Sequence, residues 1–253
     1  MRPWLLAESN WKQIKEARID LAILPWGATE AHNYHLPYST DTLLATHVAA
    51  ESARLAWEKG ARLTVLPTIP YGVNTGQFDI QLDINLNPST QFLILQDIVE
   101  NLNRHNIHKL LILNSHGGND FKQMIRELGL KYPNMFISST NYYQAIVELD
   151  YFEKAGEHAG EMETSLMMHL EPQLIKPLSE AGNGKDKKFN ISAFNEKWAW
   201  AERKWSQVTA DTGIGDPSLS SAPKGETAFK AIVSKMSNFL LELCTADLNN
   251  LYE

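Results

Sequence analysis

The feature that most constrains this fold is a set of three short apolar runs separated by longer segments of helical character. The runs cover residues 21–26, 63–66 and 110–114. None of them alternates strictly between apolar and polar residues, which is typical of strands that are buried on both faces of a parallel sheet. Parallel strands need crossover connections, and helices usually supply them. The chain is therefore predicted to fold as an α/β protein.

The segments around these runs agree with that prediction. Helices are predicted for residues 42–59, 87–106 and 120–131, and a fourth strand for residues 135–140. A last helix is indicated by apolar residues at the helical period: Phe229, Ile232, Val233, Met236, Leu240 and Leu243. The alternating order predicts one three-layer α/β/α domain over residues 1–253, with a mostly parallel sheet. An irregular stretch at 172–225 is long enough to suggest a functional role.

Composition narrows the functional classes. A formal net charge of -7 argues against a sequence-independent grip on nucleic acid, which needs clustered Lys and Arg. The single cysteine, Cys244, excludes an intramolecular disulfide and a cysteine-based zinc site, as expected in a reducing compartment. The N-terminus lacks the apolar run of a signal peptide, and no window approaches the ~18 apolar residues of a membrane span. A cytoplasmic location without membrane contact is expected.

Two of the predicted strands run directly into residue types that bind metal ions. Glu30 and His32 follow the first strand, and His116 follows the third. The carboxyl ends of parallel strands meet at one edge of the sheet, where ligands bind. Mixed carboxylate and imidazole ligands suit zinc, manganese or iron better than magnesium or calcium. The alternative for Glu30 and His32 is a polar loop with a solvated carboxylate and an incidental histidine.

Three further residues fit the same site, each with a structural alternative. Asp41 precedes a helix, where it could act as the N-cap, bridge metal ions, or do both. Asn119 could cap the next helix. Between it and His116 stand two glycines, which allow close approach of a ligand. Glu163 shares one helical stripe with apolar residues, so its carboxylate needs a cation or a salt bridge, for which Lys154 is the nearest candidate.

Four motifs occur along the chain in a fixed order. They read Glu30-Ala31-His32 with His35-Leu36-Pro37 and Asp41, Asn114-Ser115-His116-Gly117-Gly118-Asn119, His158-Ala159-Gly160 with Glu163-Thr164-Ser165, and Thr212-Gly213 with Gly215-Asp216-Pro217. Together, over residues 4–245, they resemble the signatures of the creatininase (creatinine amidohydrolase) family.

The resemblance implies a centre of two divalent metal ions per chain, zinc, manganese or iron. Glu30, Asp41 and His116 would hold one ion, and His32 with a bridging Asp41 would hold the other. Creatininase places Tyr-Glu after the ligand histidine of the second motif and uses that Glu as a ligand. Here these positions are Gly117 and Gly118, so the missing ligand must come from elsewhere. Glu163 is the candidate because its buried stripe requires a cation; a one-metal site is the alternative.

The other site residues are expected to handle the substrate. The resemblance implies that His158 is the catalytic acid/base, and the neighbouring Glu157 could orient it or be solvated. Substrate contacts are expected from His35, Gly117, Gly118 and Asn119. The two glycines are expected to open space beside the metal. Departures from the family pattern at Asn33-Tyr34 and at residues 73–79 lie near the expected mouth of the cleft and bear on the substrate.

The predicted function is hydrolysis of a non-peptide C–N bond, in a cyclic amide or a formamide of a small molecule. The alternatives are a non-catalytic relative that binds or assembles, and a two-metal phosphoesterase. Creatininase uses two tryptophans between its ligand and catalytic histidines, and the stretch from His116 to His158 contains none. Efficient hydrolysis of creatinine itself is therefore not expected. The resemblance also implies a homo-oligomer, which in many relatives is a hexamer.

Overall fold

The computed structural model describes residues 2–252. Its sheet has the strand order β2-β1-β3-β4, and every neighbouring pair is parallel. The strands are β1 (Leu21–Trp26), β2 (Leu63–Val65), β3 (Lys109–Asn114) and β4 (Phe136–Asn141). The helices are α1 (Trp11–Glu16), α2 (Thr40–Glu58), α3 (Pro88–Arg104), α4 (Lys122–Lys131), α5 (Glu161–Leu170), α6 (Ser192–Asn195), α7 (Trp205–Val208) and α8 (Ala222–Thr245). The predicted α/β fold with a parallel sheet is confirmed.

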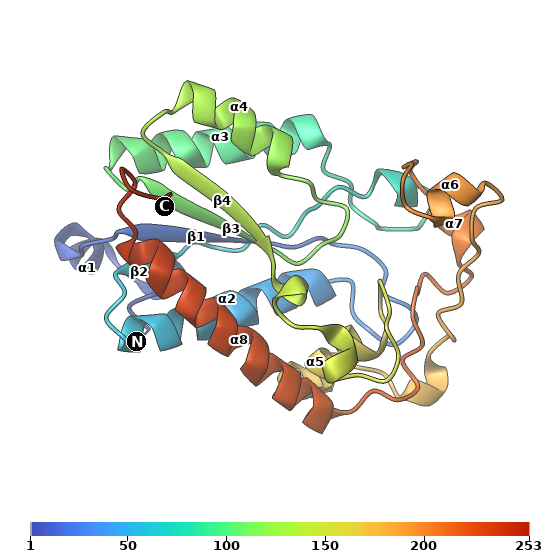
Figure 1. Ribbon diagram of the computed structural model, residues 1–253. Coiled ribbons are helices and arrows are strands. Elements are labelled where there is room, and N and C mark those ends of the chain that lie inside the picture. The colour runs from blue at the N-terminus through green and yellow to red at the C-terminus, as the bar shows by residue number, and fades with distance from the viewer. Residues whose placement is uncertain (1, 253) are drawn as a thin grey trace.

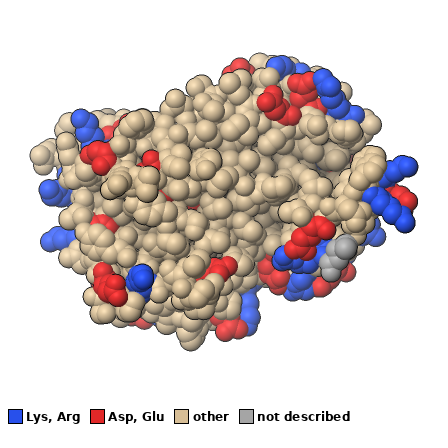
Figure 2. Space-filling model, turned by 180° about the vertical axis from the view of Figure 1, so that it is seen from behind, with Lys and Arg blue, Asp and Glu red and all other residues tan. Residues whose placement is uncertain are grey.

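The helices cover the sheet on both faces, with α3 and α4 on one side and α2, α5 and α8 on the other (Figure 1). The short helices α6 and α7 lie beyond one end of the sheet, within the stretch that was expected to be irregular (Figure 1). Seen from behind, a broad part of the surface carries no charged side chain, and charges of both signs lie around its margin (Figure 2). Among residues 2–252, no helix is long and apolar enough to cross a bilayer.

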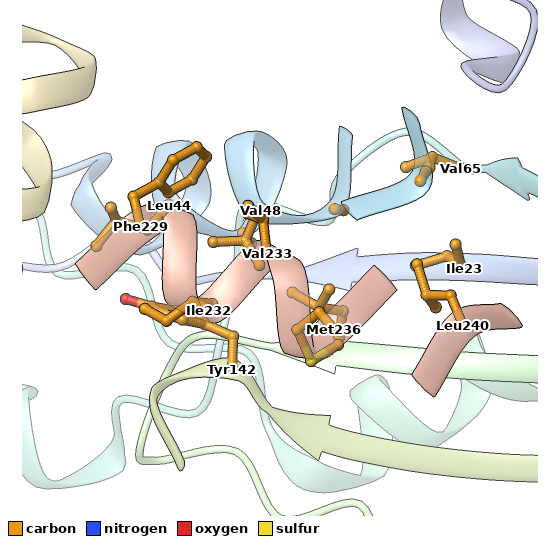
Figure 3. Close-up of a cluster of buried hydrophobic side chains, with 14 of the residues drawn as sticks. Ile23, Leu44, Val48, Val65, Tyr142, Phe229, Ile232, Val233, Met236 and Leu240 are labelled. Atoms are coloured by element: carbon orange, nitrogen blue, oxygen red, sulfur yellow. The ribbon is translucent and has the colours of Figure 1, made fainter. Parts of the chain in front are cut away.

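Alternate residues of the strands build two separate cores. Leu21 and Ile23 of β1 pack with α2 and α8, whereas Ala22, Leu24 and Trp26 pack with α3 and α4. The larger core places the apolar stripe of α8 against α2 and the sheet (Figure 3). Because each strand is buried on both sides, its sequence shows a continuous apolar run.

The starts of two helices differ from the sequence-based prediction. The N-cap of α2 is Ser39, so Asp41 lies inside the first turn and does not cap the helix. The N-cap of α4 is Phe121, and Asn119 is not its cap. The side chain of Asn119 instead ties neighbouring segments together by accepting hydrogen bonds from the Val73 N–H and the Gln91 amide. Both polar side chains therefore remain at the carboxyl edge of the sheet.

Candidate metal centre

Four of the predicted ligands meet at the carboxyl edge of the sheet. Glu30 and His32 follow β1, Asp41 lies in the first turn of α2, and His116 follows β3. His116 Nδ1 lies 2.8 Å from Glu30 Oε1 and 3.1 Å from Asp41 Oδ2. His32 Nε2 lies 3.5 Å from Asp41 Oδ1. All four side chains are buried, so their charged and polar atoms contact one another instead of water.

Each of three histidine rings is held by a main-chain carbonyl. His116 Nε2 donates to Val73 O at 2.9 Å, His32 Nδ1 to Glu30 O at 3.1 Å, and His158 Nε2 to Ala31 O at 2.9 Å. The N–H that makes such a bond fixes the tautomer and leaves the other ring nitrogen as an acceptor. Those other nitrogens face Glu30 or Asp41. This is the arrangement in which an imidazole can bind a metal ion.

Charges at the centre are balanced among the ligands themselves when no ion is bound. Burial opposes the charge on His32, but Asp41, Glu163 and Glu30 outweigh it and raise its pKa to about 10. Burial likewise opposes the charge on His116, yet Glu30 and Asp41 raise its pKa well above the ordinary value. Burial would raise the pKa of Glu30, and the neighbouring histidines hold it well below the usual range. Protons thus occupy the positions that a cation could take.

The donor atoms fit divalent cations. Three groups each place three ligand atoms within 4.8 Å of one another: Glu30, Asp41 and His116; His32, Asp41 and Glu163; and Glu30, His32 and His158. Within the described chain, the buried His32 Nε2 has no hydrogen-bond partner, and the buried Glu30 Oε1 and Asp41 Oδ2 have none besides the adjacent ring of His116. Buried atoms without a partner are unfavourable, and a cation would satisfy them. Nitrogen and carboxylate donors of this kind are typical of zinc and manganese sites.

Glu163 comes from the first turn of α5, as predicted, but it is only partly buried. Its Oε2 accepts a hydrogen bond of 2.5 Å from the N–H of Ala159. Burial raises the pKa of Glu163 to about 7. The carboxylate with a structural salt bridge is its neighbour Glu161, which is fully buried and pairs with Lys224 at 2.5 Å. Lys154, the nearest candidate for a salt bridge to Glu163, pairs with Asp216 instead.

The two glycines after His116 are not equivalent. A Cβ at Gly118 would lie 2.3 Å from Val73 O and 2.5 Å from His116 Nε2, the two atoms of the hydrogen bond that orients His116. A Cβ at Gly117 would meet no atom of the described chain within 4 Å, apart from its neighbours. The expectation that both glycines open space is therefore wrong for Gly118, because the carbonyl of Val73 takes that space.

Two other predicted site residues, His35 and Glu157, make contacts away from the candidate ligand atoms. His35 is buried, its Nε2 lies 2.9 Å from Thr164 Oγ1, and burial lowers its pKa to about 4. Glu157 is exposed and forms an ion pair of 2.9 Å with Arg203. The structure does not bring the Glu157 carboxylate to the ring of His158, which Ala31 O orients instead.

Two contacts of the centre had no counterpart in the sequence-based prediction. The indole of Trp205 in α7 packs edge-on against His158, with 5.5 Å between the ring centroids. Gln77 Nε2 donates to Glu30 Oε2. Each contact joins residues that are 47 positions apart in the chain. A pattern of short-range spacing cannot reveal such pairs.

Comparison with known proteins identifies the family. The sequence model for creatininase, described as creatinine amidohydrolase, matches residues 7–240. The chain belongs to the creatininase family. The resemblance inferred from the four motifs is thus confirmed. The predicted enzyme class, a metal-dependent hydrolase that acts on C–N bonds, is confirmed as well.

Individual relatives and a solved structure match most of the chain. A creatinine amidohydrolase from Pseudomonas putida is 28% identical over 200 residues, covering 67% of this chain and 73% of its own. A mycofactocin precursor peptide peptidase from Mycolicibacterium smegmatis is 24% identical over 231 residues, covering 90% and 87%. The crystal structure of a Bacteroides fragilis protein assigned to the creatinine amidohydrolases is 44% identical, covers 100% of both chains and superposes with a TM-score of 0.94.

Proposed function

We propose that this chain hydrolyses a non-peptide C–N bond of a small molecule, in a cyclic amide or a formamide, at a centre of two divalent cations. Glu30, Asp41 and His116 would hold one ion, and His32, Asp41 and Glu163 the other. The observation that carries the proposal is the orientation of His32 and His116. Each gives its N–H to a main-chain carbonyl and turns its second nitrogen toward the carboxylates.

The cations and His158 would divide the chemistry between them. A bound divalent cation lowers the pKa of water toward ~7 and polarises a carbonyl oxygen. Burial and the neighbouring His32 lower the pKa of His158 to about 4, so its ring is neutral at pH 7 and can accept a proton. Its Nε2 is held by Ala31 O, which leaves Nδ1 to take the proton of the attacking water and to pass it to the leaving nitrogen.

The shape of the site bears on the choice of substrate. Trp205 supplies an aromatic surface beside His158, and Gly117 leaves open space next to the ligand His116. Apolar and aromatic walls with a few oriented polar groups suit a small ligand. The combination supports a substrate bulkier than creatinine, such as a lactam with a side chain or a formamido compound.

Zinc and manganese are the ions to test. Solved creatininase structures include one described as the manganese form and another described as a Zn-Zn type. Both have the fold of this chain, with TM-scores of 0.79 and 0.76. The two groups that contain Asp41 match a pair of such ions in their donor types.

A peptide is the second candidate substrate. The relative from Mycolicibacterium smegmatis that matches 90% of this chain is named as a peptide peptidase. A peptide bond is also a C–N bond of an amide, so the same centre could act on it. The size of the substrate beyond the scissile bond distinguishes the two candidates.

Metal analysis and a substrate panel test the proposal. The protein reconstituted with zinc or manganese is expected to hold two ions per chain, and Asp41→Ala should lose both because Asp41 belongs to both groups. Asp97→Ala, at an exposed position of α3, is the control and should keep them. Cyclic amides, formamides, short peptides and a chromogenic phosphate ester are then compared as substrates. Full metal content in Asp41→Ala would contradict the bridging assignment.

Self-association stays a prediction of the family resemblance. The broad uncharged surface in Figure 2 supports it, because the cores of protein interfaces are depleted of charged residues. Light scattering after size exclusion gives the molecular mass directly, and a mass of 28.6 kDa would correspond to a monomer.

A further inference from the structure

The segment 74–84 holds the backbone on both sides of the candidate ligand Glu30. Ile84 N donates to Thr29 O at 3.0 Å, and Asn74 Nδ2 donates to the same carbonyl at 3.2 Å. Asp83 Oδ1 accepts from Ala31 N at 2.7 Å. The residues before and after Glu30 are thus both fixed by this segment, and its first part, up to residue 79, belongs to the stretch where the sequence departs from the family pattern.

Gln77 contacts the carboxylate of Glu30 itself. Its side chain is 5% exposed, and its Nε2 donates to Glu30 Oε2. The other oxygen, Glu30 Oε1, faces three imidazoles: it lies 2.8 Å from His116 Nδ1, 3.7 Å from His158 Nδ1 and 4.0 Å from His32 Nε2. The amide therefore occupies one carboxylate oxygen and leaves the other one for the centre.

The opposite end of the same amide has no partner. Gln77 Oε1 is buried and accepts no hydrogen bond within residues 2–252. A buried oxygen without a hydrogen-bond partner destabilises the fold, so an amide is a poor choice if the position only has to fill space. Reversing the amide would direct Oε1 at Glu30 Oε2, where two oxygens without a proton repel one another. Donation to Glu30 is thus the contact that accounts for a glutamine here.

We propose that Gln77 is a positioning residue that determines which oxygen of Glu30 is available to a metal ion. By occupying Oε2, it restricts Glu30 to binding through Oε1, the oxygen that faces His116 and His158. The inference rests on the proposed metal centre. It adds which side chain decides the oxygen through which Glu30 binds a metal ion. Partners that hold a ligating carboxylate typically change metal affinity ten- to a hundredfold when they are removed.

The test compares variants at two glutamines of the same segment. Gln77→Met keeps an unbranched side chain of similar length and removes the N–H, while Gln77→Glu keeps the shape and also lacks the N–H when ionised. Gln81→Met is the matched control, because Gln81 is exposed. Each protein is titrated with Co²⁺, whose visible absorption reports its coordination, and with Zn²⁺ in competition with a chromogenic chelator.

Both Gln77 variants are expected to bind Zn²⁺ about ten- to a hundredfold more weakly and to shift the Co²⁺ spectrum, while Gln81→Met matches the parent. Circular dichroism is used to check that each variant is folded, and a change of the Co²⁺ absorption spectrum distinguishes positioning from a purely structural role. Parental affinity and spectrum in folded Gln77→Met would overturn the role of Gln77 alone. A parent protein that binds no ion would overturn the metal centre as well.

Discussion

Gly118 offers a direct test of how His116 is oriented. A methyl group placed there by Gly118→Ala would lie 2.3 Å from Val73 O and 2.5 Å from His116 Nε2, which are joined by a hydrogen bond of 2.9 Å. Neither distance is compatible with the present positions, so the carbonyl or the ring must move. Neither atom is the far end of a flexible chain, since one belongs to the backbone and the other to a buried ring.

The expected magnitudes follow from these two contacts. Loss of the partner of a ligand histidine typically weakens metal binding ten- to a hundredfold, or about 1.4–2.8 kcal/mol. Crowding of a packed site costs roughly 1–3 kcal/mol of folding stability, whereas a tolerated replacement of glycine by alanine would add ~0.4–1 kcal/mol. Gly118→Ala should therefore bind zinc more weakly and also unfold more easily without metal.

Gly117→Ala is the matched control. It adds the same methyl group one position earlier, where no atom of the described chain beyond its neighbours lies within 4 Å. Zinc affinity is measured by competition with a chromogenic chelator, and stability by urea unfolding of the metal-free proteins. If Gly118→Ala keeps the affinity of the parent and of Gly117→Ala, the hydrogen bond to Val73 does not orient His116 for metal binding.

Three further predictions concern metal, protons and substrate. His158→Ala should keep its metal content and lose turnover, typically 10²–10⁴-fold. Glu163→Gln should lower the occupancy of one ion. If Glu163→Gln instead keeps its full metal content and only unfolds more easily, the carboxylate of Glu163 is structural. The pKa of His32 is raised to about 10, and that of His116 is raised as well. Metal binding at pH 7 should therefore release protons. The metal affinity should rise about tenfold per pH unit for each proton displaced. Calorimetry in buffers of different ionisation enthalpy checks this, and binding without proton release would refute the charge balance described for the centre. Creatinine should be a poor substrate, and turnover within about tenfold of a typical ~10 s⁻¹ would contradict the argument from the missing tryptophans.

The fold could be predicted because its strands are buried on both faces. Burial on both sides produces continuous apolar runs, and the long crossovers between them leave few topologies. Helix starts were harder to place, since Ser39 and Asp41 are both favourable caps and only the backbone path decides between them. The candidate ligands Glu30, His32 and His116 could be proposed from the sequence for a related reason: each follows a strand whose end could be located.

The supporting contacts of the centre could not be predicted from the sequence. Trp205 and Gln77 reach the centre from segments with no regular periodicity. Glu157 was expected beside His158 because they are adjacent in the chain, yet its side chain points to Arg203. Val73 contributes a carbonyl group, and because every residue has one, such an acceptor leaves no trace in the sequence.

The use of carbonyl groups as anchors makes the three imidazoles tolerant of mutation. A side chain that orients a histidine is lost by a single substitution, whereas the oxygens of Val73, Glu30 and Ala31 persist whatever residue stands there. Substitutions can therefore accumulate at positions 31 and 73 while the rings keep their direction, as long as the backbone path is conserved. The chain could in this way acquire new specificity in the surrounding loops without first having to rebuild its ligands.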